Sequence, residues 1–413
     1  MRDEIPMHPE AVIPQANPAL LRKTRVRIRI RARVFCMRAL LVVLCTVGFF
    51  LTVFPEGRAF TRSALLLPDL LSVSQSGPSS WSNEPVAHSQ LTAHSLDGTI
   101  NLDVYAPTTA VPLVARVRSG ILVVAGVGDN RQDPQLVNLL ESLAHTGLVV
   151  MSMTTPALSA YTLSINDVDS TVQAFKILGH LPGMDGKRIG IISISGGVGL
   201  TCLAAADPRI RAAVSYVVAF GGYFNVKSLL HTFGRRAQDI DGKTVRFQPI
   251  AVPIQVLANT TGQYLASDER TAITNAFLVG GQPLTSDEIA HLSPGAQAIY
   301  TLLAGTAPGD ADTNMAKLPA SMQAQFDELS PSQVIGQIQA PVFLMHDVND
   351  PSLPVSETRQ FAAALARLHH PYRYVEFHIF DHVSVHSNLD GAQLLGDGSR
   401  LFLLLNSILS FNS

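Results

Sequence analysis

The chain has 413 residues, 47% of them hydrophobic, and a formal net charge of −2 at neutral pH, as expected of a globular protein with a large core. This balance argues against a general electrostatic partner such as nucleic acid, and three cysteines argue against a disulfide framework. The sequence has no metal-ligand spacing and no phosphate-binding loop, so we expect neither a metal nor a cofactor.

A basic tract near the N-terminus is followed by an apolar segment. Residues 22–38 are rich in arginine, and residues 39–54 carry no charge. We predict a basic cytoplasmic tail over 1–38 and a single-pass membrane anchor over 39–54. Because a positive flank stays in the cytoplasm, the remaining chain is predicted to be extracytoplasmic. The apolar run is shorter than the roughly 20 residues that span a bilayer, so the core of a signal peptide is an alternative.

Residues 55–90 are rich in Ser and Pro and are predicted to be a linker. Beyond them, apolar runs typical of buried parallel strands alternate with helical patterns. Residues 121–125 form such a run, a helix opened by Asp133 and Pro134 follows, and the next strand covers 147–153. This alternation predicts a doubly wound, mostly parallel sheet with helices on both faces.

The most informative stretch lies at residues 187–206. A β-branched run ends at Ile194, Ser195 follows between the small residues Ser193 and Gly197, and a helix-compatible run continues to residue 206. Strand, small-x-Ser-x-Gly turn and helix, in this order, are typical of a nucleophile elbow. A glycine-rich turn without chemistry is the alternative.

Residues 225–329 separate the strand after this helix from the next apolar strand. A segment of this length is too long for a plain loop, and it contains several helix signals. One is a capping box formed by Thr285 and Glu288. We predict a helical insertion, either as a cap over the site or as a packing domain remote from it.

Two further polar positions follow the last predicted strands. The strand at 340–345 leads into His346, Asp347 and Asp350, and the strand at 372–380 ends before His382. Histidine is the side chain best suited to activate a serine near neutral pH, and a buried carboxylate can orient it. Asp350 is the candidate for the orienting carboxylate, with Asp347 as the alternative. His382 is the candidate for the histidine, with His386 as the alternative.

Over roughly residues 90 to 411 the chain resembles the α/β-hydrolase superfamily. The resemblance rests on the elbow around Ser195, the phrase at 346–354 and the order Ser, Asp, His. It implies a hydrolase core at 91–224 and 330–413, with the insertion at 225–329 as a helical cap.

The resemblance also implies a role for each site residue. Ser195 would be the nucleophile, Asp350 the acid and His382 the base, and the backbone N–H groups of Val127 and Gly196 would bind the oxyanion. We therefore expect a serine hydrolase that cleaves a carboxylic ester or related acyl bond of a small, apolar substrate. An acyltransferase with the same three residues and a catalytically silent binding protein are the alternatives.

Overall fold

The computed structural model describes residues 18–71, 85–96, 98–108, 117–385 and 391–412, without the side chains of 18–34, 36 and 185. The chain forms two units, Met1–Arg58 and Ala59–Ser413. Each unit is described by itself below.

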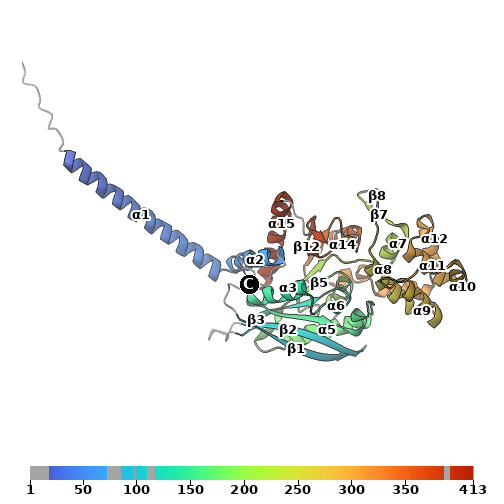
Figure 1. Ribbon diagram of the computed structural model, residues 1–413. Helices are drawn as coiled ribbons and strands as arrows, with labels where there is room; N and C mark the ends of the chain where they lie inside the picture. Colours follow the sequence, from blue (N-terminus) through green and yellow to red (C-terminus); the bar gives the residue numbers. More distant parts are fainter. Residues whose placement is uncertain (1–17, 72–84, 97, 109–116, 386–390, 413) are drawn as a thin grey trace, which may run out of the picture. The chain divides into compact units, whose positions relative to one another are not determined.

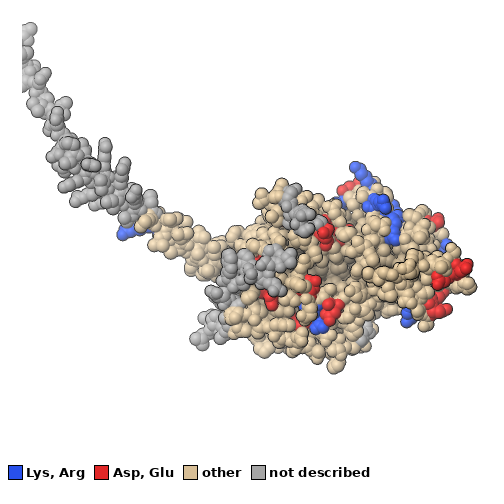
Figure 2. All heavy atoms as spheres, in the orientation of Figure 1, with Lys and Arg blue, Asp and Glu red and all other residues tan. Residues whose placement is uncertain are grey.

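The first unit consists of helix α1, Pro18–Val53, and the first turn of α2, Pro55–Leu71. Most of the described apolar side chains of α1 are exposed, among them Leu40, Val43, Leu44 and Phe49. This part of α1 shows no charged side chain between residues 39 and 53 (Figure 2). The break between the two helices requires Gly57, because a Cβ there would lie 2.1 Å from the carbonyl oxygen of Phe50.

Among the described residues, one helical segment is by itself long and apolar enough to cross a membrane, and it is C-terminal: Gly391–Asn412. Its helix α15, Gly391–Leu409, packs Leu401, Leu404 and Ile408 in the core of the second unit. The N-terminal segment meets the same criterion only as a bent pair, Met37–Val53 with Pro55–Leu71. Residues 39–53 of the expected anchor are helical, but this apolar part of α1 does not meet the length criterion by itself.

The second unit is built on an eight-stranded sheet in the order β1-β2-β4-β3-β5-β6-β9-β10. The first three strands pair antiparallel and all later neighbours pair parallel. The strands are β1 Val86–Ser95, β2 Gly98–Pro107, β3 Arg118–Val124, β4 Val149–Thr154, β5 Met184–Ile194, β6 Val214–Phe220, β9 Val342–Asp347 and β10 Tyr372–Phe377.

Helices cover both faces of this sheet because successive strand residues point to opposite sides. Ile121 and Val123 of β3 face the layer of α2, α3 and α15, whereas Leu122 and Val124 face the layer of α5, α6 and α14 (Figure 1). The helices not yet given are α3 Pro134–His145, α4 Pro156–Ser159, α5 Asn166–Gly179, α6 Gly197–Ala206 and α14 Val355–Arg367. The predicted mostly parallel sheet with helices on both faces is confirmed.

The segment expected as an insertion follows β6 and is largely helical (Figure 1). Its elements are α7 Val226–Arg235, β7 Ala237–Ile240, β8 Lys243–Arg246, α8 Ala251–Gly262, α9 Ser267–Ala276, α10 Ser286–His291, α11 Pro294–Ala304, α12 Ala311–Ala316 and α13 Ala320–Glu328. The capping box of Thr285 and Glu288 is present at the start of α10. The apolar residues of this segment are continuous with the core on the α6 side of the sheet.

The expected linker at 55–90 differs from the structure in its first half. Residues 55–71 form α2, which buries Ala59 and Leu66 against α3 and places Phe60 on Phe402 of α15, with ring centroids 5.2 Å apart. The helix carries Leu and Ala on one face. Sequence analysis missed this pattern because it considered the Ser and Pro content of the whole stretch. β1 begins at Val86, and residues 72–84 lie outside the described part of the chain.

Candidate functional site

Ser195 lies between β5 and α6 in a left-handed backbone conformation, with φ 55°. Its own N–H donates to the carbonyl oxygen of Phe220 at the end of β6 (2.8 Å), which fixes the turn against the neighbouring strand. A left-handed conformation at a residue with a side chain costs about 1–3 kcal/mol and is typical of functional turns.

The small residues around Ser195 are explained by close contacts. A Cβ on Gly197 would lie 2.7 Å from the carbonyl oxygen of Val124 and 2.8 Å from that of Ala125, so α6 begins directly against the end of β3. Ser193 stands where glycine is commoner, and its buried Oγ donates to the carbonyl oxygen of Val218 (2.8 Å). The strand therefore accommodates this serine without widening the turn.

His382 and Asp350 are in contact. His382 Nδ1 donates to Asp350 Oδ2 at 2.6 Å, with Asp350 buried and His382 partly exposed. His382 occupies the turn of a two-stranded hairpin, β11 Phe380–Asp381 and β12 Ser384–Val385, with φ 61°. We expected one continuous strand up to residue 380, but β10 ends at Phe377. With Nδ1–H held by a carboxylate, Nε2 carries the lone pair that can accept a proton.

Asp350 is surrounded by donors. Its Oδ1 accepts the backbone N–H groups of Ser352 (2.7 Å) and Leu353 (3.0 Å). Buried His346 also brings its Nε2 to 3.3 Å from Asp350 Oδ2. Burial by itself raises the pKa of Asp350, but the hydrogen bonds from His346 and His382 outweigh it and hold this pKa well below its usual range. Asp350 is therefore a carboxylate near neutral pH.

The alternative acid, Asp347, lies in another hydrogen-bond network. Its Oδ1 accepts the N–H of Asn349 (2.9 Å), and its Oδ2 accepts the N–H of Phe380 (2.9 Å), which ties the hairpin of His382 to the loop after β9. Of the other histidines, His386 lies outside the described residues. His378 follows the end of β10 and is near Asp397, with 3.7 Å between its Nδ1 and the carboxylate.

The two backbone amides predicted to bind the oxyanion belong to Gly196, next to Ser195 in the chain, and to Val127. A Cβ on Gly196 would be 3.9 Å from the nitrogen of Val127, so the two residues are neighbours although they belong to different loops. Neither N–H donates a hydrogen bond to another described residue. Asn130 holds the Val127 loop by donating its side-chain amide to the carbonyl oxygens of Val127 (2.9 Å) and Gly126 (3.4 Å).

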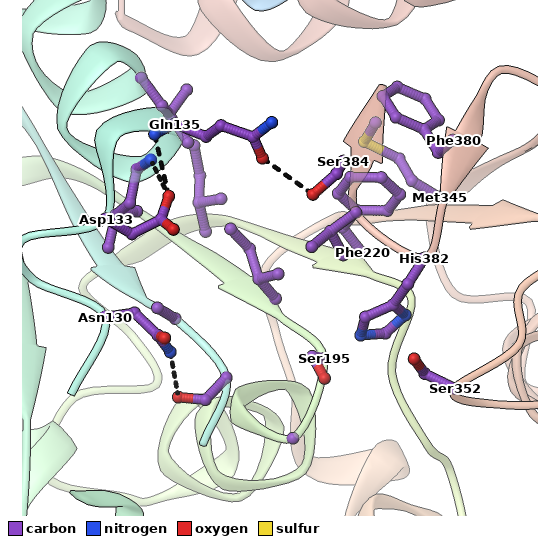
Figure 3. A pocket seen from close by; sticks show the side chains of 18 of the residues that line it. Asn130, Asp133, Gln135, Ser195, Phe220, Met345, Ser352, Phe380, His382 and Ser384 are labelled. Carbon is purple, nitrogen blue, oxygen red and sulfur yellow. Dashed lines mark hydrogen bonds between the residues drawn. The ribbon is translucent and has the colours of Figure 1, made fainter. Parts of the chain in front are cut away.

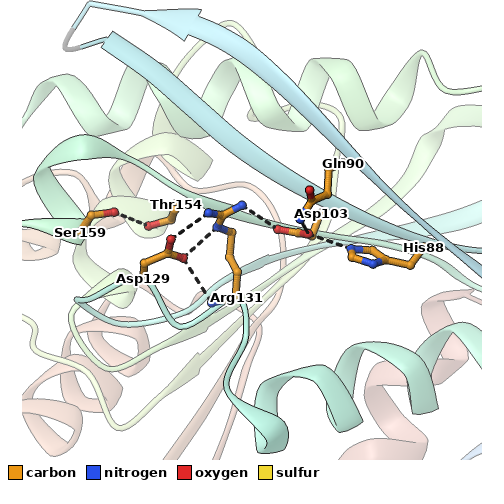
Figure 4. Close-up of polar contacts among 7 residues, drawn as sticks. All are labelled: His88, Gln90, Asp103, Asp129, Arg131, Thr154 and Ser159. Atoms are coloured by element: carbon orange, nitrogen blue, oxygen red, sulfur yellow. Dashed lines mark hydrogen bonds and ion pairs between the residues drawn. The ribbon is translucent and has the colours of Figure 1, made fainter.

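An ion pair between partly buried Arg131 and fully buried Asp103 fixes the other end of this loop (Figure 4). Arg131 donates to Asp103 Oδ2 of β2 (3.1 Å) and forms two hydrogen bonds with Asp129, each 2.8 Å. The Asp103 side chain is fully buried, and its other oxygen accepts from His88 (2.7 Å) and Gln90 (3.0 Å). Sequence analysis assigned no role to His346, Asn130, Arg131 or Asp103. Only His346 had a signal, as part of the 346–354 phrase.

Ser195 and His382 line the same cavity, of about 470 Å³, together with Val127, Gly196 and Ser352. Both side chains point into it in Figure 3, and Ser195 Oγ forms no hydrogen bond with His382 in this conformation. Such a bond is often absent before substrate binds. Apart from the site residues, the lining is mainly aliphatic, and Val256 and Leu257 of α8 belong to it.

Other reactive groups are few in the described part of the chain. No cluster of three or more His, Cys, Asp or Glu side chains there is arranged to hold a metal ion. The thiol of Cys202 on α6 is fully buried, and burial raises its pKa to about 12, so it is a packing residue.

No family model and no curated protein matches this chain, whereas many solved structures do. Similar structures include dipeptidyl peptidase 4 from Porphyromonas gingivalis (14% identity, TM-score 0.43, covering 76% of this chain and 35% of that one). Two others are a puromycin-hydrolyzing peptidase from Mycobacterium tuberculosis (16%, TM-score 0.45, 78% and 39%) and a hyperthermophilic esterase from Pyrobaculum calidifontis (15%, TM-score 0.43, 86% and 92%). The chain spans little more than a third of the two peptidases. All three names describe hydrolases, and at these identities the activity of this chain rests on its own residues.

Proposed function

From an α/β-hydrolase fold with these residues at the ends of its strands, we propose that this protein is a serine hydrolase that cleaves a carboxylic ester or related acyl bond. The contact between His382 Nδ1 and Asp350 Oδ2, 2.6 Å, carries the proposal, because it leaves His382 Nε2 free inside the cavity that Ser195 also lines. A histidine oriented by a buried carboxylate beside a serine on a strained turn is the arrangement that acyl transfer requires.

The reaction would proceed in two steps. Ser195 Oγ attacks the carbonyl carbon while His382 Nε2 takes the serine proton, and the N–H groups of Val127 and Gly196 bind the oxyanion. His382 then protonates the leaving alcohol, which departs and leaves an acyl-enzyme on Ser195. Water, deprotonated by His382, attacks the acyl-enzyme, releases the carboxylic acid and restores the serine hydroxyl.

An ester is favoured over a peptide by the character of the cavity wall, whose aliphatic side chains offer few partners to peptide groups. An acyltransferase would use the same residues with an alcohol or amine in place of water. The partition of products in the presence of an added alcohol separates the two activities.

The test of the nucleophile is labelling with a fluorophosphonate followed by mapping of the labelled peptide. We expect Ser195 to carry the label, and Ser195→Ala to lose it together with hydrolysis of p-nitrophenyl butyrate. Loss of a triad nucleophile costs on the order of 10⁶ in kcat. Ser352→Ala is the matched control, since Ser352 lines the same cavity. A catalytically silent protein would take no label, and a label on Ser193 would refute the assignment.

We further propose that α1 anchors the protein in a membrane, with the N-terminus cytoplasmic and the second unit outside. The exposed apolar side chains of residues 39–54 support this, because a water-exposed helix rarely presents so many together. The basic tract before them supports the orientation. Protease added to sealed cells should digest residues beyond 60 and spare the tract. A soluble protein with a new N-terminus after residue 54 would contradict the anchor.

A further inference from the structure

The cavity at Ser195 is larger than an ester group needs. We call the part of this cavity that lies between the sheet and the layer of α2, α3 and α15 the inner channel. It is lined by Leu71, Leu139, Ile192, Val218, Leu405 and Ile408. The whole cavity has a volume of about 470 Å³, within the range of roughly 300–1,000 Å³ of pockets that hold small ligands.

The polar side chains at the α2 end of the inner channel bond to one another. Asn138 of α3 donates to the carbonyl oxygen of Asp69 (3.0 Å), and Ser142 donates to its carboxylate (3.2 Å). These bonds attach the last turn of α2 to α3, so this wall of the channel is fixed. The remaining side chains of the inner channel are aliphatic and offer no hydrogen bond to a ligand.

We infer, on the basis of the proposed function, that the substrate carries a long unbranched aliphatic chain that lies in the inner channel while its ester group reaches Ser195. Aliphatic side chains from the sheet and from the helix layer face this space, so it suits an apolar chain better than a polar ligand. Each methylene group buried there should raise affinity about fourfold until the channel is full.

The main test blocks the channel in the full-length protein. Leu405 faces the channel from α15, and Leu403, two residues earlier, has an exposed side chain (52%) on the outer face of the same helix. We expect wild-type kcat/KM to rise along p-nitrophenyl esters from acetate to dodecanoate. Leu405→Trp should lower the ratio of dodecanoate to butyrate activity at least tenfold, and Leu403→Trp should leave it unchanged. Leu139→Trp on α3 gives the same test should the first variant fail to fold.

Two comparisons locate the chain further. A series of n-alkyl acetates varies the length of the alcohol instead of the acid. If kcat/KM rises along this series and not along the p-nitrophenyl esters, the channel holds the alcohol chain. Val256→Trp narrows the cavity from α8. A length preference that disappears in Val256→Trp and persists in Leu405→Trp would overturn the inference.

A binding measurement separates this inference from the proposed function. The fluorescence of cis-parinaric acid should rise on addition to the Ser195→Ala protein, hexadecanoate should displace it, and butyrate should not. Leu405→Trp should weaken its binding at least tenfold, with Leu403→Trp as the control. Chain binding without ester hydrolysis would refute only the hydrolase. Ester hydrolysis that is independent of chain length, with no binding of the acid, would refute only the channel.

Discussion

The pair of Arg131 and Asp103 provides a test of how the oxyanion loop is held. Arg131→Met removes the contact to Asp103 and both hydrogen bonds to Asp129. Breaking a buried ion pair costs about 3–5 kcal/mol because one charge is left without its partner. The Arg131 side chain is partly exposed, and Asp103 keeps hydrogen bonds from His88 and Gln90, so we expect a smaller loss, about 1–3 kcal/mol of unfolding free energy.

The effect on catalysis should exceed the effect on substrate binding. The Val127 loop would keep the bonds from Asn130 and the hydrogen bond from Gly128 N–H to the carbonyl oxygen of Leu158 (2.7 Å) but would lose its attachment to β2, and complete loss of an oxyanion donor costs about 10²–10³ in kcat. We expect Arg131→Met to lower kcat for p-nitrophenyl butyrate by about 10- to 100-fold with KM changed far less. Urea denaturation measures the stability of the same preparation.

Arg209→Met is the matched control. Arg209 pairs with Asp207 and Asp169, but its side chain is 43% exposed, and exposed ion pairs contribute about 0–1 kcal/mol. The double variant Asp103→Leu/Arg131→Met removes both charges and should recover stability but not kcat. An Arg131→Met protein with stability and kcat close to those of Arg209→Met would refute the role of the ion pair.

Three further outcomes follow from the site. Gly197→Ala should nearly abolish fluorophosphonate labelling, because its Cβ would meet two backbone oxygens, whereas Gly196→Ala should be milder, since its closest contact is a Val127 methyl group at 3.2 Å. Asp350→Asn should lower kcat about 10⁴-fold, and Asp347→Asn, measured in the same assay, should lose stability but keep most activity. The folded-state pKa of Asp350 is depressed, so its contribution to stability is present above about pH 4 and is lost as the pH falls further. Urea titrations from pH 5 to pH 3 should therefore show a smaller loss for Asp350→Asn than for the wild type.

The sequence alone predicted the features that depend on local patterns. The turn at Ser195 is tight, so Gly197 has no room for a side chain, and the strand, turn and helix around it are adjacent in the chain. The alternation of apolar runs predicted the sheet, because this pattern too can be read from neighbouring residues. The position of His382 was predicted, but its hairpin was not, because two-residue strands carry no periodic signal.

Features that depend on contacts between distant segments were not predictable in this way. Arg131 reaches Asp103 across the sheet, and neither position belongs to a motif. The inner channel requires that α2 pack against α3, about 60 residues further along the chain, and against α15, more than 300 residues further along, and no local pattern predicts this packing. This packing could not be predicted from the sequence, but it places one face of α15 on the channel and the other in solvent, which allows a test. Leu403 and Leu405 are two residues apart on one helix, and only Leu405 faces the cavity.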